Sequence, residues 1–245
     1  MLEISVTVLT KNASKSLRDT LELLKDFSDV IVLDNGSTDN TLAIAENYPN
    51  VRIFKHSFIG FGPLHNLASS YALYDWIFSI DSDEVLSQNL FEEIRTLHLD
   101  EKFVYSFPRK NFYKGQHIKG CGWGTNHVVR LFNRKIFSFS QDQVHEKVVA
   151  SQMSIIYLQN PLLHTPYHSI SEFLHKMQLY SDLFAEQSNQ KSSPLKALAH
   201  AFMAFFKSYI LKKGLFDGYA GFLISAYNGH TAFYKYLKLY EKNAC

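Results

Sequence analysis

The sequence predicts an α/β fold: a mostly parallel sheet flanked by helices, followed by a C-terminal helical region. Over the first hundred residues, short β-branched or aromatic runs alternate with segments of helical spacing. From about 101 to 170 the strand-like runs continue but are separated by irregular loops, and a helical periodicity begins after Ser169. We therefore expect an α/β domain over 1–170 and a helical region over 171–245.

The first half of the predicted domain has a repeated strand and helix order. Strands are expected at 3–9, 30–34, 51–55 and 76–81, and helices at 14–25, 40–48 and 63–74. Pro63 suits a first helical turn. Open parallel sheets bind ligands at the carboxyl ends of their strands, so the residues at those ends are the first candidates for a site. They are residues 10–12, 34–39 and 81–84.

The second half is expected to add strands and then helices. Strand-like runs occupy 103–107, 128–132 and 153–158. Apolar residues then recur at steps of three and four over 173–184 and again over 195–209, with a polar break at 186–194. This spacing predicts two helices separated by a loop.

Composition excludes several classes of protein. With 245 residues, 46% of them hydrophobic, and only six prolines and eleven glycines, the chain is expected to be globular rather than fibrous or disordered. Two cysteines without a CxxC spacing argue against a disulfide framework or a cysteine zinc site. No secretory pattern or spanning apolar segment is read, so the expected location is cytoplasmic.

Charge is distributed unevenly along the chain. Residues 1–100 hold 7 basic and 15 acidic residues, whereas 101–245 hold 18 basic and 8 acidic residues. This polarity predicts a metal ion in the first half and an anionic partner for the second, the alternative being charges that are merely solvated. Arg109, Lys110, Lys114 and Lys119 form a basic cluster suited to an anionic acceptor, and no nucleic-acid motif accompanies them.

Two acidic segments contain the candidate metal-binding and ligand-binding residues. Asp81 and Asp83 follow an apolar strand, and two carboxylates at that spacing can hold a hard divalent cation beside a diphosphate; the alternative is an ordinary acidic strand end. Asp34 ends an earlier strand, before Gly36 and a group of residues able to cap the next helix. Because capping does not require Asp34, we expect it to bind a ligand.

These motifs, together with Thr10, Lys11 and Asn12, resemble the nucleotide-sugar domain of family-2 glycosyltransferases, which have the Rossmann-like GT-A fold. The resemblance extends to the bacterial lipopolysaccharide inner-core β-1,4-glucosyltransferase subfamily over nearly the whole chain. The segments that carry it are Asn66, 130–132, 144–147, 163–164 and 207–240.

The resemblance implies a role for each candidate. Asp34 would face the uracil or ribose, Asp81 the nucleoside, and Asp83 a divalent metal ion (Mg²⁺ or Mn²⁺) that bridges the donor diphosphate. His164 would be a further metal ligand or diphosphate partner, or else a core histidine. The remaining nucleotide-sugar contacts would be Thr10, Asn12, Asn66 and Arg130.

The general base is expected among carboxylates near residue 146. An acceptor hydroxyl that attacks an anomeric carbon must lose its proton, and a carboxylate within hydrogen-bond reach is the usual agent. Glu146, flanked by His145 and Lys147, is the candidate, and Asp142 is the reserve. The chain departs from the family at His65, where Arg or Lys often stands.

The resemblance therefore predicts a metal-dependent, inverting transferase that moves a hexose, by likeness glucose, from a UDP-sugar to an anionic lipid-linked lipopolysaccharide core acceptor. A nucleotide-binding protein without turnover and a nucleotidyl transferase are the alternatives. Aromatic residues mixed with lysines in the last helices also predict peripheral contact with an anionic membrane, against packing in a core or a dimer. They are Phe202, Phe205, Phe206, Tyr209, Phe216, Tyr219 and Phe222, with Lys207, Lys212 and Lys213.

Overall fold

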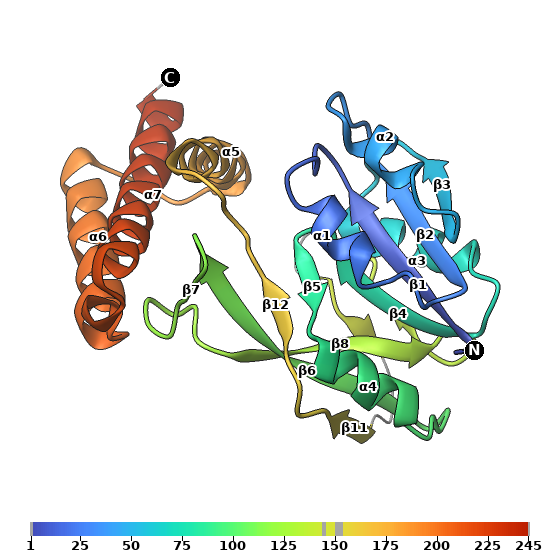
Figure 1. The fold of residues 1–245 in the computed structure, drawn as a ribbon. Helices are drawn as coiled ribbons and strands as arrows, with labels where there is room; N and C mark the ends of the chain where they lie inside the picture. Colours follow the sequence, from blue (N-terminus) through green and yellow to red (C-terminus); the bar gives the residue numbers. More distant parts are fainter. Residues whose placement is uncertain (1, 144–145, 150–153, 245) are drawn as a thin grey trace. The chain divides into compact units, whose positions relative to one another are not determined.

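The computed structural model describes residues 2–143, 146–149 and 154–244, and the chain divides into two compact units (Figure 1). The first comprises Met1–Arg109 and Asn126–His164, and the second comprises Lys110–Thr125 and Thr165–Cys245. The expected division at residue 170 differs from this in two respects. The helical unit begins at Thr165, and it also takes in 110–125, because Ile118 and Cys121 are buried in its own apolar core.

The first unit is built on a mixed sheet with the strand order β3-β2-β1-β4-β8-β6-β12-β5. The four strands expected near the start are present and parallel: β1 (Ile4–Thr10), β2 (Asp29–Asp34), β3 (Val51–Lys55) and β4 (Trp76–Asp81). The next strands pair antiparallel to this group: β8 (Asn126–Asn133) with β4 and β6, and β12 (Leu162–His164) with β5 (Glu84–Leu86).

The other strands include one long strand inside this sheet and several short ones. They are β6 (Phe103–Tyr113), which is divided between the two units, its partners β7 (Gln116–His117) and β11 (Ser154–Tyr157), and a separate pair of β9 (Ser138–Phe139) with β10 (Val148–Val149). The three expected strand-like runs of 101–170 therefore lie in β6, β8 and β11.

Both faces of the parallel strands are covered, which explains why these strands are almost continuously apolar. Alternate residues of β2 enter different cores: Val30 and Val32 pack with one set of helices, and Ile31 and Leu33 with another. The first core includes α1 (Leu17–Glu22) and α4 (Gln88–Thr96), and the second includes α3 (Phe61–Ser70). α2 (Thr41–Ala45) is a single short turn between β2 and β3.

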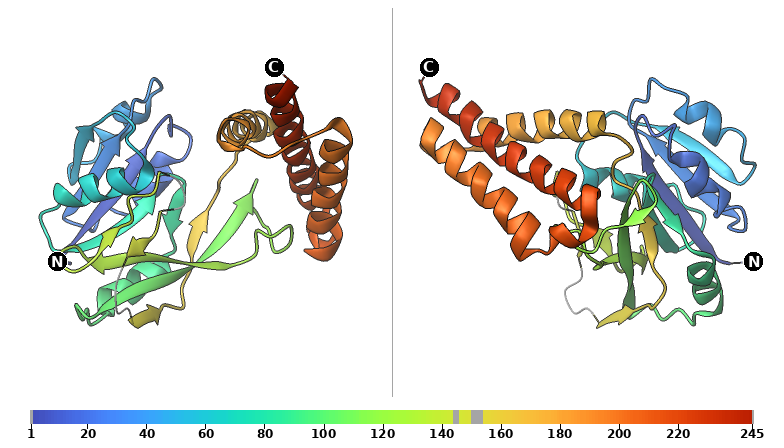
Figure 2. Two further views of the ribbon diagram at one scale, coloured as in Figure 1. Left: turned by 180° about the vertical axis from the view of Figure 1, so that it is seen from behind. Right: turned by 60° about the vertical axis from the view of Figure 1, so that its left-hand side comes forward.

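The second unit is helical, as the periodicity predicted. Its helices are α5 (Ile170–Gln187), α6 (Pro194–Phe206) and α7 (Gly218–Ala244), with the turns η1 (Lys207–Leu211) and η2 (Gly214–Asp217) between the last two. Ser169 and Ser193 cap α5 and α6 by accepting the backbone N–H three residues on, and Pro194 opens α6. Figure 2 shows α6 and α7 running side by side.

The core of the second unit is aromatic. Trp123 stacks on Tyr167 and Phe173, with ring centroids 5.7 and 6.1 Å apart, so its ring takes part in this packing. Among the described residues of the chain, no helix is long and apolar enough to cross a membrane.

Candidate functional site

The register of the parallel strands brings the predicted site residues to one edge of the sheet. Thr10 pairs with Asp34 across β1 and β2, and Leu9 pairs with Asp81 across β1 and β4. Three strand ends that are far apart in the sequence therefore finish at the same level. This is the edge at which an open parallel sheet receives its ligand.

Asp34 holds the turn that follows β2. Its carboxylate accepts hydrogen bonds from the backbone N–H of Gly36 at 3.0 Å and of Ser37 at 3.0 Å, and Gly36 has a φ of 100° that favours glycine. Asp34 does not cap α2, which begins at Thr41, but it does hold the turn before that helix. The same residue also lines an open pocket of about 350 Å³, together with Gly36, Ser37, Leu42, Lys55, His56 and Ser57.

Asn12 ties the end of β1 to this turn. Its backbone N–H donates to Ser37 Oγ at 2.8 Å, and its side-chain oxygen accepts from Thr38 N at 2.8 Å. The hydroxyl of Thr10 is buried and has no hydrogen-bond partner among the described residues. Asn12 thus shapes the rim of the site, while Thr10 lies below it.

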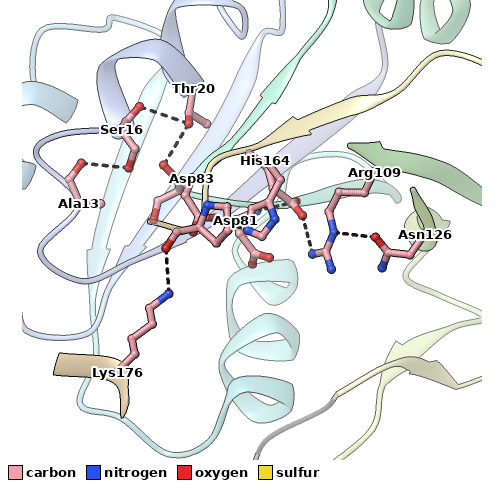
Figure 3. A network of polar contacts seen from close by, with 12 residues as sticks. Ala13, Ser16, Thr20, Asp81, Asp83, Arg109, Asn126, His164 and Lys176 are labelled. Atoms are coloured by element: carbon pink, nitrogen blue, oxygen red, sulfur yellow. Dashed lines mark hydrogen bonds and ion pairs between the residues drawn. The ribbon is translucent and has the colours of Figure 1, made fainter. Parts of the chain in front are cut away.

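Asp83 and His164 are adjacent, as their assignment to one ion requires (Figure 3). β12 pairs antiparallel with β5, which sets His164 opposite Glu84, and His164 Nε2 lies 3.5 Å from Asp83 Oδ1. The turn between β4 and β5, which contains Ser82 and Asp83, is fixed by Thr20, whose hydroxyl donates to Ser82 O at 3.1 Å.

The separation of Asp83 and His164 is close to that of two ligands of one divalent ion. Two ligands at about 2.1 Å from one ion are about 3 Å apart when adjacent, so the observed separation fits with a small adjustment. Within the described ranges no group of three or more His, Cys, Asp or Glu side chains is placed to hold a metal. Asp83 and His164 could thus supply two ligands, and a donor diphosphate and water would have to supply the others.

Asp81 belongs to a buried ion-pair network rather than to this pair of ligands. Arg130 donates to the carboxylates of both Asp81 and Glu84, and Arg109 Nη1 lies 3.1 Å from Glu84 Oε1. Glu84 is fully buried and also accepts the backbone N–H of Asp81 at 3.1 Å. Arg130 therefore balances the carboxylates of Asp81 and Glu84. Arg109 also pairs with Glu84.

The charges of this network keep Asp81 ionised. Burial alone would raise the pKa of Asp81, but Arg130, together with His65 and His164, outweighs burial and lowers the pKa to about 2. Burial likewise opposes the charge of Arg130, and the two carboxylates raise its pKa. The carboxylate of Asp81 therefore stays ionised near pH 7, with its charge paired to that of Arg130.

Glu146 lies beside a histidine that the sequence did not single out as its partner. His65 Nε2 is 3.8 Å from Glu146 Oε1, and His65 Nδ1 is 3.0 Å from the hydroxyl of buried Ser79. Burial lowers the pKa of His65 to about 4, so this imidazole is neutral near pH 7. Glu146 itself is 20% exposed, which leaves it accessible to an acceptor. Val144 and His145 lie outside the described residues.

The first turns of α3 hold the segment that leads to Glu146. Gly62 N donates to Asp142 O at 3.2 Å, and a Cβ on Gly62 would stand 1.9 Å from Ser140 O, so only glycine fits. Asn66 is paired on both sides with Phe139, donating to its carbonyl at 2.9 Å and accepting its N–H at 2.8 Å. The amide of Asn66 therefore has a structural role, and the side chain of Asp142 is exposed.

A pH dependence of stability follows from His65. Because its folded pKa of about 4 lies below its unfolded value of 6.5, the unfolded chain binds more protons between these values, and unfolding becomes easier as pH falls from about 6.5 to about 4. The loss should reach roughly 3 kcal/mol. Urea unfolding at a series of pH values should show it, and His65→Gln should remove most of it. His117, whose pKa burial also lowers, would cause any part that persists. An unchanged slope in His65→Gln would contradict the assignment.

Sequence reasoning assigned no role to Glu84 or His65. Glu84 stands directly after Asp83, yet its link to Arg130 joins residues 46 positions apart, which local pattern does not report. His65 was noticed only because another residue type is common at that position. Its burial is the signal that matters, and burial becomes visible only in the folded chain.

Comparison with known proteins agrees with this geometry. The family described as glycosyl transferase family 2 matches residues 5–153. An uncharacterized glycosyltransferase of Rickettsia typhi is 28% identical over 98% of this chain and 88% of its own length. The lipopolysaccharide core biosynthesis glycosyltransferase LpsC of Rhizobium meliloti is 25% identical over 99% of this chain and 94% of its own.

Solved structures share the fold. Staphylococcus aureus TarS 1-349 in complex with UDP-GlcNAc has a TM-score of 0.51 at 15% identity, over 87% of this chain and 75% of that chain. The mannosyltransferase PcManGT from Pyrobaculum calidifontis, in complex with GDP-Man and Mn²⁺, has a TM-score of 0.50 at 14% identity, over 93% and 73%. The expected GT-A fold is confirmed, and the chain belongs to glycosyltransferase family 2.

Proposed function

We propose that this chain transfers a hexose from a UDP-sugar, with inversion at the anomeric carbon, to the core region of a lipid-linked lipopolysaccharide precursor. One observation carries the proposal. Asp83, His164 and Glu146 belong to the same unit as the carboxyl ends of the parallel strands. Similarity to LpsC over 99% of this chain supports the class of acceptor. Glucose rests on the resemblance alone.

In the proposed reaction, Glu146 accepts the proton of an acceptor hydroxyl as its oxygen attacks the anomeric carbon. The new carbon–oxygen bond forms on the face opposite the bond to the diphosphate, which breaks and releases UDP. Asp83 and His164 would hold the divalent ion, Mg²⁺ or Mn²⁺, which when bound offsets negative charge on the diphosphate.

The donor nucleoside is proposed to lie in the pocket beside Asp34. This pocket combines a backbone turn with Lys55, His56 and Ser57, which offer donors to a ribose, a base or a phosphate oxygen. Thr10 and Asn12 are at the adjoining strand end. Asp81, held in place by Arg130, would act on the nucleoside by accepting a hydrogen bond.

The acceptor is proposed to be anionic because lipopolysaccharide core precursors carry phosphates and acidic sugars. Lys110, Lys114 and Lys119, which belong to the second unit, remain candidates for its recognition. UDP-sugars are soluble and the acceptor is lipid-linked, so we place the reaction in the cytoplasm at the inner face of the cytoplasmic membrane. No nucleic acid is involved in this proposal.

The donor class can be tested by thermal shift with and without Mn²⁺, using UDP-glucose, UDP-galactose, GDP-mannose and ATP. A ligand at about a hundred times its Kd stabilises a protein by about 2.7 kcal/mol, so a UDP-sugar should raise Tm by several degrees. Release of UDP on adding membrane-derived acceptor should follow. A shift with ATP alone would favour nucleotidyl transfer, and a UDP-sugar shift without any turnover would favour a non-catalytic binding protein.

A further inference from the structure

α6 exposes a continuous apolar face. Five large apolar residues at helical steps of three and four lie on one side of α6 and η1, and all are exposed; their exposed fractions are Leu195 77%, Leu198 58%, Phe202 66%, Phe206 38% and Ile210 42%. We call these five residues the α6 face. Isolated exposed apolar residues are common, whereas a continuous stripe of this length marks an interaction site.

The opposite side of α6 packs on α7, with small residues between the ring contacts that Phe205 and His200 make. Ala197 is buried, and a Cβ on Gly229 of α7 would lie 3.1 Å from Ala201 O, which shows how closely the two backbones approach. A helix that folds only to complete its own unit turns its large apolar residues inward. α6 instead turns the five residues of the α6 face outward, so this part of its sequence serves a contact outside this unit.

The structure also separates the aromatic residues that sequence analysis grouped together. Phe205 and Tyr209 are half-buried, stack on one another with centroids 5.4 Å apart, and contact Phe222 edge-on. These two therefore take part in packing. Phe216 and Tyr219, by contrast, are 77% and 65% exposed, just beyond the end of the α6 face.

Only positive charge accompanies this surface. Between residues 187 and 240 the sequence has seven lysines and a single acidic residue, Asp217. Asp217 is buried and accepts the backbone N–H groups of Lys119 and Gly120, at 3.1 and 2.6 Å, so it is turned inward. Lys207, Lys212 and Lys213 are exposed at the end of the α6 face.

We propose that the α6 face, with Lys207 and Lys213 beside it, docks into the interface of an anionic lipid bilayer. Apolar side chains would enter the boundary between headgroups and acyl chains, and the lysines would remain at the level of the anionic headgroups. A second copy of the chain fits this surface less well. A two-fold contact brings the same patch against itself, and here it would oppose lysines to lysines without an acidic residue between them.

The test is co-sedimentation of the full chain with vesicles of phosphatidylcholine alone or with phosphatidylglycerol added. Binding is expected to the anionic vesicles at low salt and to fall steeply at high salt. Leu198→Gln with Phe202→Gln should lower the partition coefficient by about tenfold or more, because both side chains are exposed and their loss removes buried apolar area only in the bound state. Lys207→Gln with Lys213→Gln should lower it by a similar factor at low salt.

Matched controls distinguish binding through the α6 face from nonspecific binding through any exposed apolar or basic residue. Leu73→Gln removes an exposed apolar residue from the first unit, and Lys25→Gln with Lys102→Gln removes two exposed lysines from it; both should bind vesicles like the parent chain. The proposal is overturned if anionic vesicles are not bound at low salt, or if Leu198→Gln with Phe202→Gln binds normally. It is also overturned if that variant only abolishes a concentration-dependent dimer, measured by sedimentation velocity. Donor binding to the soluble protein is measured separately, so failure here leaves the proposed function standing.

Discussion

Replacement of Glu146 by Gln is expected to lower kcat by roughly two to four orders of magnitude, with little change in donor affinity. Gln keeps the size of the side chain but cannot accept the hydroxyl proton. Glu146 is 20% exposed and His65, its neighbour at 3.8 Å, is neutral near pH 7, so the exchange leaves no buried charge unpaired. Initial rates of UDP release, with donor affinity from calorimetry, measure both quantities.

Asp142→Asn is the matched control for this prediction. Asp142 lies in the same loop, but its side chain is exposed and the loop is held there through its backbone carbonyl. Its substitution should change kcat by less than about threefold. The reverse ranking of the two variants would transfer the role of base to Asp142, and two mild variants would mean that the base lies elsewhere.

Asp83→Asn is expected to lower kcat/KM by about three orders of magnitude and to abolish the metal dependence of UDP binding. An amide remains a ligand but supplies no negative charge, and the diphosphate brings two negative charges of its own to be offset. Asp83 is 28% exposed, so the free energy of unfolding should be nearly unchanged. Titration of UDP with and without Mn²⁺ gives the decisive comparison.

Two further variants serve as comparisons for Asp83→Asn, one at the second proposed metal ligand and one at an exposed carboxylate outside the site. His164→Asn should weaken metal-dependent UDP binding less than Asp83→Asn, because the neutral ligand offsets no charge. Asp19→Asn removes an exposed carboxylate of the same unit and should behave like the parent chain. Metal-dependent UDP binding that survives in Asp83→Asn would remove this residue from the metal site.

The regular elements were largely predictable because their signals are local. The strands expected at 51–55 and 76–81 match β3 and β4, since β-branched and aromatic runs bounded by polar residues report strands directly. The first three helices were predicted in about the right places but too long: α1 spans Leu17–Glu22 where 14–25 was expected. α5 is longer than expected, and α7 (Gly218–Ala244) was not among the helices that the spacing predicted. Helix ends depend on tertiary contacts and on capping, and spacing alone sets neither.

The site residues also divide into those that local sequence predicts and those that only the folded chain brings together. The position of Asp83 at a strand end follows from sequence, and the sheet register then gives it a place on the binding edge. The pairing of Arg130 with Asp81 and Glu84, 49 and 46 positions away, was not predicted. A buried guanidinium must be compensated by nearby carboxylates, and which carboxylates are near is decided by strand order.

The sequence by itself therefore determined the kind of fold, the carboxylates at the strand ends and the apolar period of the last helices. Only the tertiary structure decided which charges are paired, that His65 is buried beside Glu146, and that the five apolar residues of the α6 face point outward while Ala197 and Phe205 pack inward. The physical reason is the separation along the sequence over which each kind of interaction acts. Propensity and periodicity act between residues a few positions apart, whereas burial, charge compensation and the choice of a packing face depend on elements that meet only when the chain has folded.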